Sequence, residues 1–182
     1  SKGISSMAVV QDTRSLRALL HRNLAMYHQE MLVEQYIPGR EFTVGLLGNG
    51  PDTRVFEPME IVYLKQDSPY RIYSFEVKQN YQKLIRYDCP ADISASLRQK
   101  IMDTALKIFT LFGCRDFGRV DFRLSPTGEL YFIEINPLPG LAPGYSDYPM
   151  LAAFDGLSYE TLVQGVLTSA MKRLGLLPAV EG

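Results

Sequence analysis

The sequence has no tryptophan, only two cysteines and no block of charges of one sign. Its 19 basic and 20 acidic residues leave a formal net charge of −1. The chain therefore lacks the excess of basic residues that is typical of a general nucleic-acid binder or of a membrane-surface protein. Cys89 and Cys114 form no CxxC pair and suit neither a zinc site nor a disulfide framework. We therefore expect reduced thiols, a cytoplasmic location, a small-molecule partner, and no nucleic acid or membrane.

Long apolar runs and internal repeats are also absent. No run approaches the roughly 18 apolar residues of a membrane span, and the opening "SKGISSMAVV" lacks the order of a signal peptide. The first residue is Ser, so we expect the chain to begin within a longer protein. A phosphate-binding GxxxxGK[ST] loop does not occur, so a nucleotide would have to be held in another way.

The 182 residues, 46% of them hydrophobic, are enough for one domain with a core or for two small lobes. Helical spacing of apolar residues predicts helices over residues 12–26, 94–112 and 158–174. Ser94 is a candidate cap for the second of these, and Gly113 is expected to end it.

Extended runs lie between these helices. Residues 31–37 and 41–47 flank a Pro-Gly-Arg turn and predict a hairpin, and residues 54–64 predict a strand in which Pro58 favours an edge or a bulge. Residues 65–92 are polar and irregular, and residues 136–149 are rich in Pro and Gly. Because strands and helices do not alternate strictly, we expect an α+β fold, an antiparallel sheet with helices packed on it.

The stretch "GRVDFRLSPTGELYFIEINPLPG", residues 118–140, places acidic residues inside two predicted strands. Taking residues 125–128 as a four-residue turn puts Leu124 opposite Glu129. Counting back from this turn predicts the facing pairs of the whole hairpin.

In this register Arg119 lies opposite Glu134, and Asp121 and Asn136 share their face of the sheet. Asp121 and Glu134 are then diagonal neighbours, about 7–8 Å apart at the backbone, and both can reach one cation or two adjacent ones. Two carboxylates and one amide oxygen are hard ligands, which suit Mg²⁺ and do not suit zinc. The opposite face is predicted to carry Val120, Phe122, Leu124, Tyr131, Ile133 and Ile135.

Other interpretations of these residues exist. A plain surface hairpin with an Arg119–Glu134 salt bridge is common, and such a bridge contributes little. A glycosidase also uses two acids, but it needs neither the Asn nor the Arg, and sugar clefts often use Trp. A calcium-bound structural domain would take more ligands from one loop. The Pro-Gly loop after Asn136 favours a ligand site, because backbone poor in side chains can approach a ligand closely.

These residues resemble the ATP-grasp ligases, and within them the D-alanine–D-alanine ligase group. That family has a Gly-Arg-hydrophobic-Asp strand, a turn, and Glu-x-Asn followed by a Pro-Gly loop. The resemblance implies that Asp121, Glu134 and Asn136 hold two Mg²⁺ ions, with Mn²⁺ as an alternative, on the phosphates of ATP. It also implies that Arg119 stabilises an acyl phosphate and the tetrahedral species, and that the Gly140 backbone lines the same pocket.

Other segments resemble the family in the same order. "EQYIPGREFTV" is similar to the adenine hinge, which implies that Glu34 and the backbone around Gln35 and Ile37 meet the purine and that Glu41 meets the ribose hydroxyls. On its own this segment is better explained as a plain amphipathic hairpin.

"FEVKQNY" is similar to the segment in which a Lys contacts the phosphates, and this role carries over to Lys78. The opening "SKGIS" is similar to the end of the Gly-Ser loop that folds over the phosphates, which implies roles for Ser1 and Gly3. A single Lys in a loop is usually only solvated, so the assignment rests on the neighbouring sequence.

The resemblance covers essentially the whole chain and implies the C-terminal part of an ATP-grasp domain. Residues 1–64 would be the remainder of the nucleotide-binding lobe and residues 65–182 the metal and substrate lobe, with the N-terminal domain and first part of the nucleotide lobe preceding Ser1. The implied activity is an ATP-dependent carboxylate-amine ligase that joins a small carboxylate and an amine, both amino-acid-like or dipeptide-like. A homodimer is left open. The alternative is a nucleotide-binding module or a catalytically incomplete fragment.

One segment departs from the family. After Gly140 the chain reads "LAPGYSDYP", where the D-alanine ligases have a Ser-containing segment that binds the carboxylate of the second substrate. Ser146 lies near the equivalent place with different neighbours and spacing. The identity of the accepting amine therefore stays open.

Overall fold

The computed structural model describes residues 9–64 and 84–177. By its contacts the chain divides into two units, residues 1–38 with 63–86 and residues 39–62 with 87–182. In the first unit, helix α1 (Thr13–Tyr27) begins after Asp12, whose carboxylate accepts a hydrogen bond from the Ser15 amide at 2.8 Å. The predicted helix over 12–26 is confirmed, and the division into lobes after residue 64 stays a prediction.

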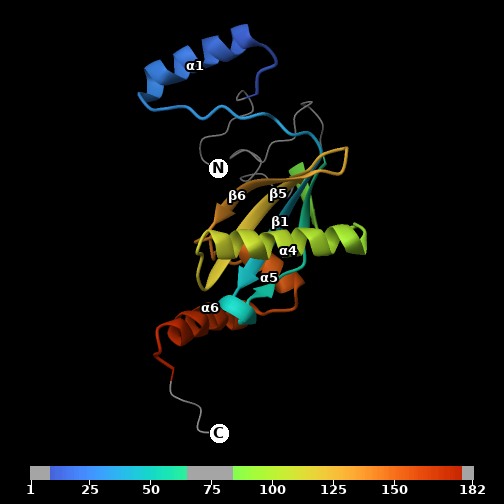
Figure 1. Cartoon of the computed structure of the whole chain (residues 1–182), viewed down its shortest axis with the longest axis vertical. Helices are drawn as coiled ribbons and strands as arrows, with labels where there is room; N and C mark the ends of the chain where they lie inside the picture. The colour runs from blue at the N-terminus through green and yellow to red at the C-terminus, as the bar shows by residue number, and fades with distance from the viewer. Residues whose placement is uncertain (1–8, 65–83, 178–182) are drawn as a thin grey trace. The chain divides into compact units, whose positions relative to one another are not determined.

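The strands form one sheet in the order β4-β3-β1-β5-β6, with β2 paired to β1 beside this path. The pairings of β1 with β2, β3 and β5, and of β5 with β6, are all antiparallel. The predicted α+β fold is therefore confirmed (Figure 1). The strands are β1 (Arg40–Leu47), β2 (Arg54–Val55), β3 (Met59–Tyr63), β4 (Ile85–Asp88), β5 (Phe117–Leu124) and β6 (Leu130–Asn136).

Helix α4 (Ala95–Leu111) crosses one face of the sheet (Figure 1). Alternate residues of β1 and β5 point to this helix, because side chains along a strand alternate between its two faces. The buried side chains described in this core are all apolar. They are Phe42, Val44, Leu46, Ile101, Ala105, Phe109, Val120, Phe122 and Leu124.

A second core lies on the other face, where α5 (Asp147–Phe154) and α6 (Tyr159–Arg173) pack. Gly45 of β1 makes room there, since a Cβ at this position would collide with Phe56 and come within 3.2 Å of Tyr148. Tyr148 also donates a hydrogen bond from its hydroxyl to the Leu46 carbonyl at 2.9 Å. The buried members of this core are Phe56, Met59, Tyr148, Leu151, Ala152 and Leu162.

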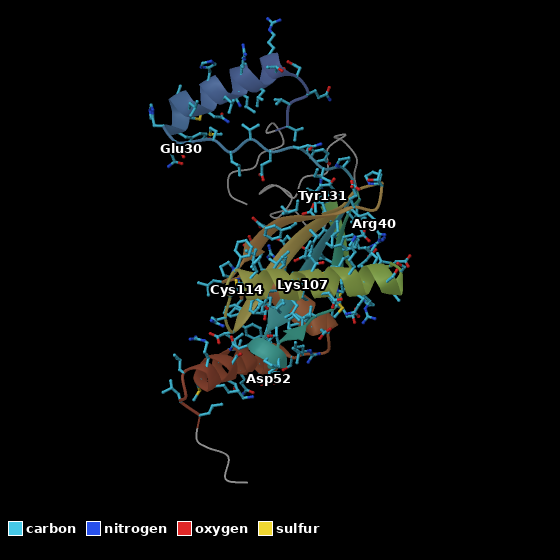
Figure 2. The ribbon with its side chains drawn as sticks, in the orientation of Figure 1. Glu30, Arg40, Asp52, Lys107, Cys114 and Tyr131 are labelled. Carbon is cyan, nitrogen blue, oxygen red and sulfur yellow. The ribbon has the colours of Figure 1, made fainter. Side chains whose placement is uncertain are left out.

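Helices α4 and α6 begin and end where the sequence predicts. Ser94 accepts a hydrogen bond from the Leu97 amide at 3.3 Å, and Ser158 caps α6 in the same way. Gly113 and Gly175 follow the helices with φ of 65° and 66°, a region that favours glycine. Figure 2 marks Lys107 on α4 and Cys114 at the turn into β5.

The predicted hairpin of residues 31–37 with 41–47 is wrong. Residues 31–38 form no strand, and β1 instead pairs along its whole length with β5. Gly39, with φ of 126°, lies so close to β5 that a side chain would collide with the Leu124 carbonyl. The partner of β1 is thus about 80 residues away, from Arg40 pairing with Leu124, and local alternation cannot identify such a partner.

The predicted strand over residues 54–64 is divided into β2 and β3 around Pro58, whose nitrogen has no hydrogen to donate to a neighbouring strand. Between them, the Phe56 amide donates to the Gly45 carbonyl at 2.9 Å. The structure places β4 within residues 65–92, which were predicted to be irregular, and the start of α5 within the Pro- and Gly-rich residues 136–149. Pro149 is accommodated in the first turn of α5, where a helix needs no amide donor. A short 3-10 turn (Gly50–Asp52) precedes β2.

Asp116 joins the sheet to the C-terminal helix. It lies between α4 and β5 with φ of 67°, and its carboxylate accepts hydrogen bonds from Arg173 Nη2 at 2.7 Å and Asn49 Nδ2 at 2.8 Å. The hydrogen bond from Arg173 is the main reason that the pKa of Asp116 lies below its usual value, and Asn49 lowers it further.

We predict that Asp116→Asn removes part of the acid sensitivity of the fold. A carboxyl whose pKa is lower in the folded state stabilises the fold above its unfolded pKa, about 3.9, and loses this contribution as pH falls through the folded value. Asn tolerates a positive φ, so the backbone is retained. Urea unfolding at pH 7 and pH 3 should show a smaller stability difference in the variant, and an unchanged difference would contradict the assignment.

Candidate functional site

The sheet face opposite α4 carries a polar cluster at the centre of β1, β5 and β6. In the observed register Thr43 faces Asp121 across β1 and β5, and Asp121 faces Glu134 across β5 and β6. Two residues along the same pair of strands, Arg119 faces Asn136. The four residues predicted to share a face, and Thr43 with them, therefore come together.

The register of the β5–β6 hairpin differs from the prediction by two residues at this cluster. Leu124 pairs with Leu130, so the connection is one residue longer than predicted, and an irregularity after Asp121 leaves Ile133 as an extra residue. Each one-residue shift moves side chains to the other face, and two shifts restore them. Asp121 and Glu134 are consequently opposite each other and not diagonal.

Between the turn and this irregularity the register differs from the prediction by one residue only. The residues of β6 predicted to share the apolar face with Phe122 and Leu124 are therefore wrong in this part of the hairpin. Phe132 faces Phe122, where the alternation predicted Ile133 and Tyr131 on that side. Tyr131 instead faces Arg123. Figure 2 labels Tyr131 on β6 and Arg40 on β1, both at the turn end of the hairpin and away from the polar cluster.

Arg119 and Asp121 form a bidentate ion pair at the centre of the cluster. Arg119 donates from Nε to Oδ1 of Asp121 at 2.9 Å and from Nη2 to Oδ2 at 2.8 Å. Thr43 Oγ1 also donates to Oδ1 at 2.7 Å. Burial by itself raises the pKa of Asp121, but the charge of Arg119 and these hydrogen bonds outweigh it and hold the pKa below its usual value. The salt bridge predicted for a plain hairpin, Arg119 to Glu134, is long at 3.9 Å.

Two residues that the sequence did not single out complete the surroundings of Arg119. Its Nη1 donates to Oδ2 of Asp147 at 3.2 Å, and the Tyr87 hydroxyl donates to Oδ1 of Asp147 at 2.9 Å. Burial lowers the pKa of Arg119, and the carboxylates of Asp121, Asp147 and Glu134 more than compensate, so it is raised. Asp147 stands directly after Ser146 in a segment that looked irregular, and nothing in the local pattern predicts its contact with β5.

Asn136 lies within hydrogen-bond distance of both other predicted metal ligands. Asn136 Nδ2 donates to Oδ2 of Asp121 at 3.3 Å and to Oε1 of Glu134 at 3.2 Å, and the Glu134 side chain is 47% exposed. Within residues 9–64 and 84–177, no group of three or more His, Cys, Asp or Glu gathers as metal ligands would. Half a turn of the Asn136 amide would instead present three hard oxygens, the donor set that Mg²⁺ accepts while it keeps water and phosphate oxygens. The residues therefore fit such an ion.

Glu41 and Gly140 lie in the same unit of the structure as this cluster. Glu41 faces Arg123 in the register and accepts a hydrogen bond from its Nη2 at 3.1 Å. Gly140 is exposed, and a Cβ there would lie 2.6 Å from Ser146 Oγ, so its backbone passes directly against that hydroxyl. Contacts of Glu41 with a ribose and of Gly140 with a substrate stay predictions.

Six predicted site residues remain. Glu34 and Gln35 are exposed and Ile37 is partly buried, in a segment of the first unit that forms no strand. Lys78, Ser1 and Gly3 lie outside the described residues. The adenine and phosphate contacts predicted for these six residues are untested by the structure. None of the helices within the described ranges is long and apolar enough to span a membrane.

Comparisons with known proteins confirm the family resemblance that the sequence motifs indicate. The family model for the D-ala D-ala ligase C-terminus matches residues 1–168. A D-alanine–D-alanine ligase of a Janthinobacterium species is 36% identical over 155 residues, which are 85% of this chain and 46% of that protein. The chain spans about half the length of the curated relatives it matches.

Solved structures show the same fold. The D-alanine–D-alanine ligase of Coxiella burnetii superposes with a TM-score of 0.72 at 24% identity, over 93% of this chain and 43% of that one. The ligase of Bacillus anthracis complexed with ATP gives a TM-score of 0.68 at 20% identity, over 90% of this chain and 50% of that one.

We predict that Thr43→Val destabilises the fold by about 1.5–3 kcal/mol, because the nearly isosteric side chain removes a buried hydrogen bond to a charged group. Thr53→Val is the matched control, since Thr53 Oγ1 donates to the Gly50 carbonyl at an exposed position. Its expected cost is below about 1 kcal/mol. Urea unfolding measures the free energy of unfolding of both variants. Equal losses would show that the hydrogen bond from Thr43 to Asp121 adds no more stability than an exposed one.

Proposed function

Because the chain belongs to the family defined by the D-ala D-ala ligase C-terminus, we propose that the protein containing it is an ATP-dependent carboxylate-amine ligase. The reaction would join a small carboxylate to an amine through an acyl phosphate, in the cytoplasm. The observation that carries this proposal is the set of polar residues on one sheet face, with the Arg119–Asp121 ion pair at its centre.

Asp121, Glu134 and Asn136 would hold Mg²⁺ against the phosphates of ATP, and the ion would neutralise the charge that spreads over the transferring oxygens. The mutual proximity of the three side chains and the exposure of Glu134 support this assignment. The Bacillus anthracis ligase, which has the same fold, was solved as a complex with ATP, and this supports the choice of nucleotide. Two ions, Mn²⁺ as a substitute, and contacts of ATP with Lys78 and the 34–41 segment belong to the same proposal.

Arg119 would act mainly as an oriented hydrogen-bond donor. Three of the five guanidinium N–H groups are directed to Asp121 and Asp147, and among the described hydrogen bonds none uses the second N–H of Nη1 or of Nη2. These two groups would contact the acyl phosphate and the tetrahedral species. Donors fixed in advance cost little reorganisation when charge develops, so their orientation matters more than the net charge of the cluster.

The substrates would be a small carboxylate and a small amine, both close to the loop of residues 137–146. Gly140 and Ser146 approach each other within this loop, so its shape would decide which amine is accepted. The sequence of the loop leaves that amine unspecified.

We predict that Asp121→Asn and Glu134→Gln each lower ATP turnover at least about 100-fold, the usual effect of losing a group that stabilises transition-state charge. Glu129→Gln is the matched control, because Glu129 is exposed at the turn of the same hairpin. The assay uses the longer protein with D-alanine and other small amino acids, and it measures phosphate release together with peptide formation.

Calorimetric titration of ADP with and without Mg²⁺ separates binding from chemistry. Binding that strengthens with Mg²⁺ in the unaltered protein and loses this dependence in Asp121→Asn supports the metal assignment. Metal-independent binding with full turnover in both variants would remove it. Metal-dependent binding without turnover of any amine would identify a nucleotide-binding module and contradict the ligase.

A further inference from the structure

The loop of residues 137–146 is attached at both ends to the same ion pair. Asn136 ends β6 just before the loop, and its Nδ2 donates to Oδ2 of Asp121 at 3.3 Å. Asp147 begins α5 just after the loop, and its Oδ2 accepts from Nη1 of Arg119 at 3.2 Å. Asp121 and Arg119 are themselves joined by two hydrogen bonds, so the ten-residue loop closes on one buried pair.

Asp147 is held firmly in this position. Its side chain is only 7% exposed, and its second oxygen accepts from the Tyr87 hydroxyl, which comes from β4. The next residue, Tyr148, is fully buried and is bonded to the Leu46 carbonyl, which fixes the first turn of α5 on the sheet. A small displacement of α5 would therefore move the Asp147 carboxylate that accepts the hydrogen bond from Arg119.

The loop is ordered from its Asp147 end. The Ser146 amide donates to the Ala142 carbonyl at 2.9 Å, and the Tyr145 amide donates to the same carbonyl at 3.3 Å. Gly140 lies against Ser146 Oγ. Gly140, which is proposed to line the substrate pocket, thus packs against Ser146, the residue that precedes Asp147.

We propose that Asp147, oriented by Tyr87, is a positioning residue that sets Arg119 and the 137–146 loop relative to each other for the ligase reaction. The inference rests on the proposed function for its kinetic consequence and on the hydrogen bonds above for its structural one. Arg119 already has a bidentate carboxylate in Asp121, so charge compensation does not require Asp147. What Asp147 adds is a third fixed direction on the guanidinium, and a mechanical link to α5. Buried ion pairs contribute little net stability, and in this protein the Arg119–Asp147 pair would instead select one orientation of Arg119.

The test compares Asp147→Asn and Tyr87→Phe with Asp155→Asn. Asp155 is the matched control, because it follows the same helix and its side chain is 12% exposed. It accepts from Arg54 Nε at 2.8 Å and does not contact Arg119 in any described interaction. All three variants are made in the longer protein, and kcat, KM, the Kd of ADP with Mg²⁺ and the melting temperature are measured.

We expect Asp147→Asn to lower kcat between about 10-fold and 100-fold, the effect of a small misplacement of reacting groups. The Kd of ADP should stay within about twofold, since the described hydrogen bonds of Asp147 join it to Arg119 and Tyr87 and not to the proposed metal ligands. Tyr87→Phe should lower kcat in the same direction by less. Asp155→Asn should lower the melting temperature without changing kcat. Unchanged kcat in Asp147→Asn, or equal losses of kcat in both Asp variants, would overturn the proposal.

Hydrogen exchange gives a readout that does not depend on activity. Amides of residues 137–146 should exchange faster in Asp147→Asn than in the unaltered protein, and at an unchanged rate in Asp155→Asn. If the longer protein proves not to be a ligase, faster exchange in Asp147→Asn would still show that the Asp147–Arg119 hydrogen bond orders the loop. Only its role in catalysis would then be rejected. Unchanged loop exchange in Asp147→Asn would show that Asp147 does not order the loop, whatever reaction the protein carries out.

Discussion

A guanidinium that is removed from water has to be surrounded by acceptors, and Arg119 organises its part of the sheet for this reason. Its side chain is 10% exposed and contacts Asp121 from the same strand and Asp147 from α5. Thr43 then fills a further acceptor site of Asp121, and Asn136 links that carboxylate to Glu134. The carboxylates proposed to bind metal, the loop proposed to bind substrate and the helix behind that loop are thereby connected through one ion pair.

The two faces of the sheet separate stability from chemistry. The face covered by α4 buries an apolar core, which needs no precise hydrogen bonding and tolerates changes that conserve volume. The opposite face is divided, with an apolar core under α5 and α6 at one end and the polar cluster beside it. Asp147 and Tyr148 show how narrow the boundary is. They are consecutive in α5, yet one contacts Arg119 and the other fills the apolar core.

The family model for the D-ala D-ala ligase C-terminus matches residues 1–168, which include both faces of the sheet. The chain spans about half the length of its curated relatives, so the complete ligase chemistry is a property proposed for a longer protein. The segment between Gly140 and Pro149 is where this chain differs from the pattern expected for D-alanine ligases. Asp147, which attaches this segment to Arg119, lies within it, so the loop proposed to bind substrate and its attachment to the ion pair are continuous in the chain.

The sequence alone determined the long helices, the class of fold and the face shared by Arg119, Asp121, Glu134 and Asn136. These follow from local rules: a 3.6-residue period with Ser and Gly at the helix ends, and alternation along two adjacent strands. The face was predicted correctly despite an error of two residues in register, because two one-residue shifts cancel. Tertiary structure alone decided the partner of β1, the start of α5, the contacts of Thr43 and Asp147 with the ion pair, and the contact of Tyr87 with Asp147. Those contacts join residues up to 78 positions apart, and they depend on how the helices pack, which no local pattern encodes.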